Sequence, residues 1–336
     1  MFVTSQNTNV KIITSSDSIP IDHHFKVIAG PGAGKTYWLV NHIKGVLRQS
    51  KKLTRSGKIA CITYTNVASE EIVRRLGDCG NSVDASTIHS FLYRNVIKPY
   101  SFLLGAEGLF NPLELNGHDD HIPNMGLVSK WKSQTEQYYL KDDSAVCKCL
   151  SELDWFFDKS DTLKLKPRNP WRQKIGKYSI RNDSFIEYKK ICWNKGFLHH
   201  EDVLYFSYNL ISKNPRILEF IRVRFPYIFI DEFQDTHPIQ AKIISLIGRE
   251  STLVGIIGDP CQSIYKFQGA SRKHFLDFKL PGIQEYKIII NRRSAANIVN
   301  FLNHFRDQEL IQEIHHIGEE NSVIVFVGDP IEVVKN

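Results

Sequence analysis

The sequence predicts an α/β fold in which a parallel sheet carries helices on both faces. Three observations in the 336 residues point to it. Short apolar runs alternate with helical patterns, as strands joined by crossover helices do. Several of these runs are apolar throughout, which is typical of strands buried on both faces. A glycine-rich turn also separates the first apolar run from the first helical pattern, where such folds bind phosphate.

Five apolar runs predict the strands of this sheet. The first run is followed by a helical pattern over residues 36–48, whose apolar side chains share one face. The second run is followed by a helical pattern that includes Ile72, Val73 and Leu76. Residues 1–24 are polar and indicate no particular element. The predicted strands are Phe25–Ala29, Ile59–Thr63, Tyr227–Ile230, Leu253–Ile257 and Tyr286–Ile290.

The middle of the chain interrupts this alternation. It is rich in aromatic and basic residues, with turn clusters at Asn116–Asp120 and Pro167–Pro170. Its helical patterns, such as Ala145–Phe157, are not separated by clear strands. We interpret this segment as a mostly helical subdomain inserted into one α/β domain. The predicted boundaries are 1–100 and 206–284 for the two parts of that domain, and 101–205 for the insertion.

Residues 285–336 are expected to begin a second domain and to leave it incomplete. A helix start is predicted near the end of the chain, with Asp329 as N-cap, Pro330 as first helical residue and Glu332 as capping-box acid. The sequence stops at Asn336, four residues after this acid. We therefore expect a chain that is shorter than its natural domain.

Composition narrows the class of protein. The chain is 42% apolar and 24% charged, as ordinary globular proteins are. Its net charge of +7 permits a polyanionic partner without requiring one. No apolar run approaches the roughly 20 residues of a membrane helix, and no signal peptide is evident. Six scattered cysteines are typical of reduced thiols, so we expect a cytoplasmic protein without membrane contact.

A phosphate-binding loop is predicted between the first strand and its helix. Glycines let backbone N–H groups turn toward phosphates, and the helix N-terminus adds positive potential. Lys35 would reach the β- and γ-phosphates, and the Thr36 hydroxyl would ligate Mg²⁺. Ala29 stands where the strict pattern has glycine, and a glycine-rich turn before a core helix is the alternative. The loop comprises Ala29, Gly30, Pro31, Gly32, Ala33, Gly34, Lys35 and Thr36.

Two adjacent carboxylates end the apolar run Tyr227–Ile230. Because ligands gather at the carboxyl ends of parallel strands, Asp231 is expected to face Mg²⁺. Glu232 is then placed to act as the general base on an attacking water. Buried neighbouring carboxylates are costly unless a cation or another partner compensates them. A solvated strand end is the alternative interpretation.

Six motifs in this order resemble those of the UvrD/Rep-type superfamily 1 helicases, over about residues 25–300. Two of them are the phosphate loop and the acidic pair. The other four are similar to the family's motifs Ia, Ib, III and IV. They are Thr63–Ala68, Thr87–Phe91, Gly258–Ala270 and Asn291–Ser294.

The resemblance implies a RecA-like P-loop NTPase domain with an inserted helical subdomain, and an ATP- and Mg²⁺-dependent DNA helicase or translocase of 3′-to-5′ polarity. It implies that Gln262 and Arg293 sense the γ-phosphate. It also implies a path for single-stranded DNA, where aromatic side chains stack on bases at about 1–3 kcal/mol per base. Core packing is the alternative for each aromatic side chain. The residues of this path are Tyr64, Asn66, His89, Tyr265 and Phe267.

Departures from the family pattern qualify this expectation. The glutamine that reads adenine has no counterpart at the usual spacing, since only Gln6 lies upstream. The late motifs of the second motor half are missing, including a second arginine of the kind worth 10³–10⁵ in rate. The chain alone is therefore expected to bind nucleotide better than it hydrolyses it. The expected partners are single-stranded DNA or DNA junctions, and a second motor half.

A different class of function stays open. The chain is alternatively a nucleotide-dependent, non-unwinding regulatory subunit of a partner nuclease or of a phage-defence complex. Weaker signals accompany both interpretations. The run Lys164–Arg181 holds seven basic residues and is either a DNA-contacting or a merely solvated surface. Cys147 and Cys149 have the wrong spacing for zinc, and His199–Asp202 is typical of a helix N-terminal charge cluster.

Overall fold

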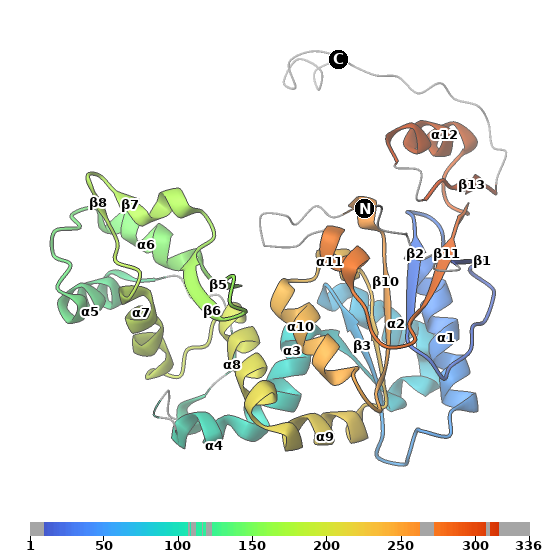
Figure 1. Ribbon diagram of the computed structural model, residues 1–336, viewed down its shortest axis with the longest axis horizontal. Coiled ribbons are helices and arrows are strands. Elements are labelled where there is room, and N and C mark those ends of the chain that lie inside the picture. Colours follow the sequence, from blue (N-terminus) through green and yellow to red (C-terminus); the bar gives the residue numbers. More distant parts are fainter. Residues whose placement is uncertain are drawn as a thin grey trace, which may run out of the picture.

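A seven-stranded parallel sheet forms the centre of the larger lobe of the computed structural model (Figure 1). The structure describes residues 10–106, 108, 112–115, 117–118, 123–262, 272–306 and 310–315. The strand order is β1-β11-β2-β10-β9-β3-β4. The bounds are β1 Lys11–Ile13, β2 Phe25–Ala29, β3 Ile59–Thr63, β4 Val83–Thr87, β9 Tyr227–Ile230, β10 Leu253–Gly258 and β11 Gln284–Ile288.

The predicted α/β class and all five predicted strands are confirmed, although the fourth strand ends one residue later than predicted and the last strand begins and ends two residues earlier. Two strands of the sheet were not predicted. β1 is a three-residue edge strand with two exposed side chains, so no burial pattern marks it. β4 mixes Asp84 and Ser86 with apolar residues, which hides it from a search for apolar runs.

The domain boundary predicted at residue 285 falls inside β11 (Gln284–Ile288). This strand pairs with β2 from Gln284 opposite Phe25 to Ile288 opposite Ala29. The chain leaves the central sheet only after Ile288. The division into an inserted subdomain and a second domain stays a prediction.

Helices cover both faces of the sheet and enclose two cores. On β2, Val27 and Ala29 pack on one side, whereas Ile28 packs on the other. The first core lies under α1 (Lys35–Gln49) and α2 (Asn66–Leu76). The second lies under α3 (Ile88–Leu92), α8 (His200–Lys213), α9 (Pro215–Arg224), α10 (Pro238–Ile247) and α11 (Arg272–Asp277).

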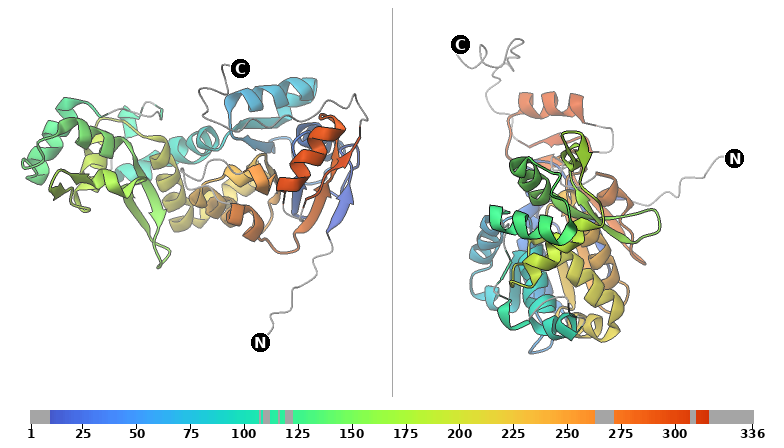
Figure 2. Two further views of the ribbon diagram at one scale, coloured as in Figure 1. Left: turned by 90° about the horizontal axis from the view of Figure 1, so that it is seen from above. Right: turned by 90° about the vertical axis from the view of Figure 1, so that its left-hand side faces the viewer.

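The inserted segment extends away from the sheet as a second lobe (Figure 2). Its interior is a separate apolar cluster that includes Trp131, Phe185 and Tyr188. Helices and two antiparallel hairpins build it, β5 with β6 and β7 with β8. The bounds are α5 Met125–Thr135, α6 Asp143–Ser151, β5 Leu153–Phe157, β6 Leu163–Pro167, β7 Lys174–Ile175, β8 Tyr178–Ser179 and α7 Ser184–Trp193. The preceding helix, α4 (Lys98–Ala106), packs Leu104 into the core of the sheet lobe.

The helical pattern expected over Ala145–Phe157 is wrong in its second half. The helix ends at Ser151, and Leu153–Phe157 forms a strand opposite Leu163–Pro167. Aromatic residues favour strands, and Leu163 and Leu165 alternate with lysines on the partner strand. A single apolar run is compatible with either element, and only the pairing decides between them.

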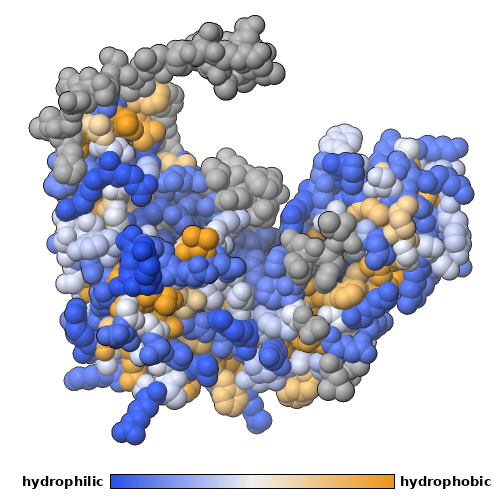
Figure 3. All heavy atoms as spheres, turned by 180° about the vertical axis from the view of Figure 1, so that it is seen from behind, coloured by the Kyte–Doolittle hydropathy of each residue, from blue (hydrophilic) through white to orange (hydrophobic). Residues whose placement is uncertain are grey.

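The described end of the chain returns to the top of the sheet. β12 (Ile290–Asn291) pairs in parallel with β13 (Glu313–Ile314), and α12 (Ala296–Phe305) connects them in the sequence. The helix start expected at Asp329 lies outside the described residues. Within the described residues, no helix is long and apolar enough to cross a bilayer. Seen from behind, a hollow separates the two lobes (Figure 3).

Candidate nucleotide site and nucleic-acid path

The predicted phosphate loop connects the end of β2 to the start of α1. Gly34 is the N-cap residue of α1 and has a φ of 84°, while Gly32 has a φ of 71°. Both values lie in the left-handed region that glycine adopts without steric cost. At Gly32 a β-carbon would also lie 2.5 Å from Asn291 Oδ1. The glycines therefore shape a loop that has no room for side chains.

Lys35 is the first residue of α1 and faces the carboxylates after β9. Its Nζ donates to Glu232 Oε2 at 2.9 Å. The Lys35 side chain is 9% exposed, whereas Glu232 is 37% exposed. The structure thus brings the predicted phosphate-binding lysine and the predicted general base into direct contact.

Asp231 and Glu232 occupy different environments although they are adjacent. Asp231 is buried, and burial together with the neighbouring Glu232 raises its pKa to about 6, against the opposing effect of Lys35. Glu232 has a φ of 52°, a conformation that costs a non-glycine residue about 1–2 kcal/mol. Backbone strain of this kind is concentrated at active sites. The pair therefore has the perturbed carboxyl and the strained backbone of a functional site.

A chain of hydrogen bonds joins Glu232 to Gln262. Gln234 Nε2 donates to Glu232 Oε2 at 2.7 Å, and Gln234 Oε1 accepts from the Asp259 backbone N–H at 3.0 Å. Gln262 Nε2 donates to Asp259 Oδ2 at 2.6 Å. Gln234 and Asp259 were not among the predicted site residues. Asp259 lies inside the predicted motif Gly258–Ala270, and Gln234 comes two residues after the acidic pair, so their position in the sequence was the available signal.

The segment after β11 lies directly against the phosphate loop. Asn291 Nδ2 donates to the Pro31 carbonyl at 3.0 Å, and the Arg292 backbone N–H donates to the Gly32 carbonyl at 2.9 Å. A β-carbon at Gly32 would lie 2.8 Å from Arg293 Cβ. The structure therefore places Arg293 beside the loop, as a γ-phosphate sensor requires.

Sequence reasoning missed two further residues of this segment. Gln312 Nε2 donates to the Pro31 carbonyl at 3.0 Å. Arg306 donates to Asp259 Oδ2 at 2.9 Å, and its side chain is only 7% exposed. Neither residue belongs to a predicted motif, so only the tertiary structure reveals them.

The donor set fits a nucleotide with its metal. The glycine loop has the shape that holds phosphates, and the Asp231 carboxylate is an oxygen ligand of the kind Mg²⁺ prefers. Thr36 follows Lys35 at the start of α1. Among the described residues, no group of three or more histidine, cysteine or acidic side chains is placed to hold a metal ion. A nucleotide-bound Mg²⁺ needs only one or two carboxylates beside the phosphates.

The predicted DNA-path residues lie at the carboxyl ends of β3 and β4. Tyr64 is 39% exposed, and Asn66 begins α2 with an exposed side chain. His89 is partly buried on α3, and burial together with His200 and His118 lowers its pKa to about 3. His89 is therefore a neutral ring near pH 7. Tyr265 and Phe267 lie outside the described residues.

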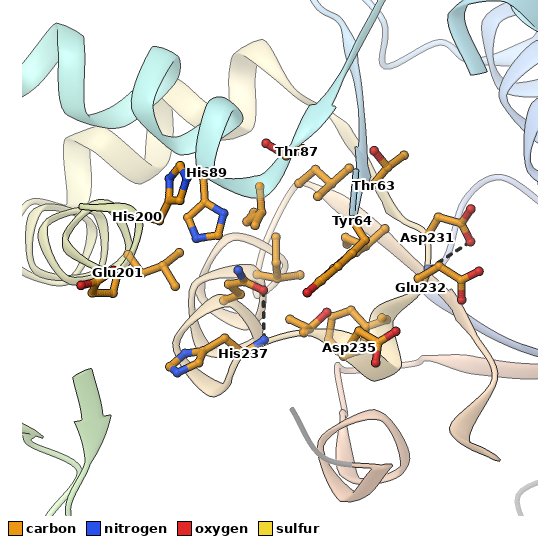
Figure 4. Close-up of a pocket in the computed structure, with 18 of the residues that line it drawn as sticks. Thr63, Tyr64, Thr87, His89, His200, Glu201, Asp231, Glu232, Asp235 and His237 are labelled. Atoms are coloured by element: carbon orange, nitrogen blue, oxygen red, sulfur yellow. Dashed lines mark hydrogen bonds between the residues drawn. The ribbon is translucent and has the colours of Figure 1, made fainter. Parts of the chain in front are cut away.

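A cavity of about 300 Å³ is lined both by residues of the nucleotide site and by predicted DNA-path residues (Figure 4). Asp231 and Glu232 line one part of it, and Tyr64 and His89 line another. The basic run Lys164–Arg181 lies on the two hairpins of the insertion, where Trp171 is 85% exposed. The contact of that run with DNA stays a prediction.

Comparison with known proteins finds relatives named DNA helicase II and one relative named Gabija protein GajB. The chain is 27% identical over 301 residues to DNA helicase II of Haemophilus influenzae, covering 84% of this chain and 38% of that protein. For DNA helicase II of Escherichia coli the identity is 26% over 288 residues, with 82% and 37% covered. For Gabija protein GajB of Bacillus cereus it is 24% over 345 residues, with 89% and 49% covered.

The chain therefore spans about half the length of these relatives or less. The model of the UvrD/REP helicase N-terminal domain matches residues 14–281, which include the phosphate loop, the acidic pair and the whole insertion. The family resemblance inferred from the motifs is thereby confirmed. This chain belongs to the UvrD/REP helicase N-terminal domain family.

Proposed function

We propose that this chain is the first motor half of an ATP-dependent DNA helicase or translocase, which couples ATP hydrolysis to 3′-to-5′ movement along single-stranded DNA. One observation carries the proposal. Hydrogen bonds link Lys35, Glu232, Gln234, Asp259 and Gln262 in one continuous chain. Glu232, one member of this hydrogen-bonded series, lines the cavity that Tyr64 also lines. A change at the phosphates can therefore reach the DNA path.

The residues of the nucleotide site have complementary roles. The loop N–H groups and Lys35 bind the phosphates, while Thr36 and Asp231 hold Mg²⁺. The ion supplies charge neutralisation for the phosphoryl group. Glu232 accepts a proton from the attacking water, an effect worth about 10²–10⁴ in rate. Since Lys35 contacts Glu232, phosphate binding exchanges this carboxylate for a phosphate and leaves Glu232 available as a base.

The γ-phosphate is sensed from two sides in this proposal. Gln262 lies at the far end of the hydrogen-bonded chain, and Arg293 lies beside Gly32 of the loop. A second motor half, from the same protein or from another subunit, is proposed to supply the remaining arginine. Without it, we expect nucleotide binding and weak turnover.

The proposal is tested by measuring ATP binding and hydrolysis by this chain, with and without single-stranded DNA. Lys35→Ala is expected to lose nucleotide affinity. Glu232→Gln is expected to keep affinity but to lose turnover by about 10²-fold or more, because an amide cannot accept the proton. Absence of any affinity for single-stranded DNA would contradict the proposal.

An extension of this experiment, with the second motor half and a nuclease added, separates the second candidate function, the non-unwinding regulatory subunit. That function uses the same nucleotide site but needs no movement along DNA. Restoring the second motor half should then leave turnover weak, and nucleotide binding should instead change the activity of an added nuclease. DNA-stimulated turnover on restoring the second half favours the motor.

A further inference from the structure

Arg306 joins the segment after β11 to the central sheet. It is the C-cap residue of α12, and its side chain is only 7% exposed. It donates from Nη2 to Oδ2 of Asp259 at 2.9 Å, across 47 positions of the chain. Asp259 directly follows β10 and is fully buried. The two residues therefore form a buried ion pair between parts of the chain that are far apart in the sequence.

Asp259 lies at the centre of the hydrogen bonds that hold the predicted catalytic residues. The oxygen that accepts from Arg306 also accepts from Gln262 Nε2, at 2.6 Å. The Asp259 backbone N–H donates to Gln234 Oε1 at 3.0 Å, and Gln234 Nε2 donates to Glu232 Oε2 at 2.7 Å. Among the described residues, Arg306 is the one cation paired with Asp259. The position of this aspartate thus bears on both the proposed γ-phosphate sensor and the proposed general base.

A second buried arginine provides a structural comparison. Arg222 is also 7% exposed, and it donates to the backbone carbonyls of Ile247 at 3.0 Å and Leu246 at 2.8 Å. Its remaining nitrogen, Nη1, pairs with Glu250. In Arg306, by contrast, Nη1 is buried and has no hydrogen-bond partner in the part of the chain that the structure describes. An unpaired buried donor costs stability, so saturated bonding does not explain the position of Arg306.

The charge of Arg306 supports the acceptor on which Gln262 depends. A buried carboxylate that loses its counterion is strongly destabilising, and the groups around it are expected to rearrange. Such a rearrangement would release the Gln262 amide from Asp259. In the ion pair, the amide is held by one of its two N–H hydrogens, and the other stays available for a phosphate. The pair therefore fixes a donor in place without using it up.

We propose that Arg306 is a positioning residue of the nucleotide site, which holds Asp259 so that Gln262 faces the γ-phosphate. Through Gln234, the same aspartate also keeps Glu232 oriented. This inference rests on the proposed function and adds to it a residue outside the six motifs. Because ADP has no γ-phosphate, the loss of Arg306 affects the response to ATP and leaves ADP binding unchanged.

The test compares Arg306→Met with the unmodified full chain. Isothermal titration gives the affinities for ADP and for the imido analogue of ATP, and phosphate release gives turnover at saturating ATP. The affinity for ADP is expected to stay the same. The preference for the ATP analogue over ADP should fall by about tenfold, because a charged hydrogen bond is lost. Turnover should fall by about tenfold or more, since misplacing a reacting group by about 1 Å can cost up to 10²-fold.

Further substitutions separate positioning from packing. Arg306→Lys keeps the charge opposite Asp259 and should restore most of the turnover and of the preference for ATP. Arg222→Met is the matched control at equal burial, and it should lower the urea midpoint without changing the affinity ratio or the turnover of the folded chain. If Arg306→Met does not fold, Arg306→Gln replaces it, because glutamine keeps one donor but no charge. The same pattern is then expected with smaller losses.

The outcomes assign each failure to one proposal. An Arg306 variant that folds and keeps both the preference for ATP and the turnover would overturn the positioning role and leave the proposed function standing. Equal losses in Arg306→Met and Arg222→Met would also overturn that role, since altered packing would then explain the effect. An unmodified chain that binds neither nucleotide would overturn the proposed function and this inference together.

Discussion

Two buried lysines, Lys35 and Lys189, show what separates a functional charge from a structural one in this molecule. Lys189 is fully buried and donates to Glu201 at 2.8 Å and to Asp202. Asp202 is also fully buried and accepts from the indole N–H groups of Trp155 at 3.1 Å and Trp193 at 3.0 Å. Each charge in this network has several partners.

Lys35 is almost as buried but has a very different partner. Its Nζ contacts Glu232, which is partly exposed and has a strained backbone. The carboxylate can be exchanged for a phosphate without uncovering an isolated charge. Burial alone therefore does not identify function. A buried charge whose partner is accessible and replaceable indicates a functional site. A buried charge whose partners are all buried as well, such as Lys189, stabilises the fold.

The largest expected effect is a loss of stability when the network of Lys189, Glu201 and Asp202 is broken. Lys189→Met should lower the free energy of unfolding by about 3–5 kcal/mol, because it leaves the Asp202 carboxylate buried without its cation. Urea denaturation of the chain measures this change. Lys190→Met is the control, since Lys190 is 46% exposed and, among the described residues, pairs only with Glu187. It should change stability by less than about 0.5 kcal/mol. Equal effects of both substitutions would remove the distinction.

Lys35→Met should show the reverse behaviour. Nucleotide affinity is expected to fall by about a hundredfold, equivalent to roughly 3 kcal/mol, because the charge that neutralises the phosphates is lost. Stability without nucleotide should fall by less than about 1 kcal/mol, since Glu232 is accessible to water. Isothermal titration and urea denaturation give the two numbers. A Lys35 variant that unfolds as readily as Lys189→Met would break the comparison.

The smallest expected effect is in the pH dependence of the two buried aspartates. The folded pKa of Asp231 is raised to about 6, so its contribution to stability is fully present only below the ordinary aspartate pKa and is lost as the pH rises through about 6. The folded pKa of Asp202 is instead lowered, mainly by Lys189 against the effect of burial. Its contribution is present above the ordinary aspartate pKa and is lost as the pH falls below it.

Magnesium binding adds a measurable consequence. In the proposed function the ion needs the ionised form of Asp231, so Mg²⁺-dependent nucleotide affinity should fall by about fivefold between pH 6 and pH 5. Titrations from pH 5 to 8, with and without Mg²⁺, test this. Asp231→Asn should flatten the profile. A profile that stays equally steep in this variant would assign the titration to another group.

The features that could be predicted from the sequence are those that depend on residues close together in it. The phosphate loop and the acidic pair are each contiguous in sequence, and their roles depend on neighbours a few residues away. The sheet strands were predictable where both faces are apolar, as in Tyr227–Ile230. The strand Leu153–Phe157 was not, because a short apolar run is equally compatible with a helix.

The rest of the site depends on residues brought together from distant parts of the chain. Arg306 meets Asp259 across 47 positions, and Gln312 meets Pro31 across 281. No periodicity or spacing rule predicts such contacts. His237 illustrates the same limit, because its Nε2 lies 3.9 Å from Oδ2 of Asp154, an insertion residue far away in the sequence.

The contacts on the back of the phosphate loop have an electronic consequence. The Pro31 carbonyl accepts two hydrogen bonds, from Asn291 and from Gln312, and it shares one peptide group with the N–H of Gly32. A hydrogen bond to a carbonyl polarises its peptide and strengthens the N–H as a donor, by about 10–30% per bond. Asn291 and Gln312 therefore strengthen a donor of the loop that binds phosphate in the proposed function. Loss of either hydrogen bond would weaken the loop's attraction for anions even with every loop atom in place.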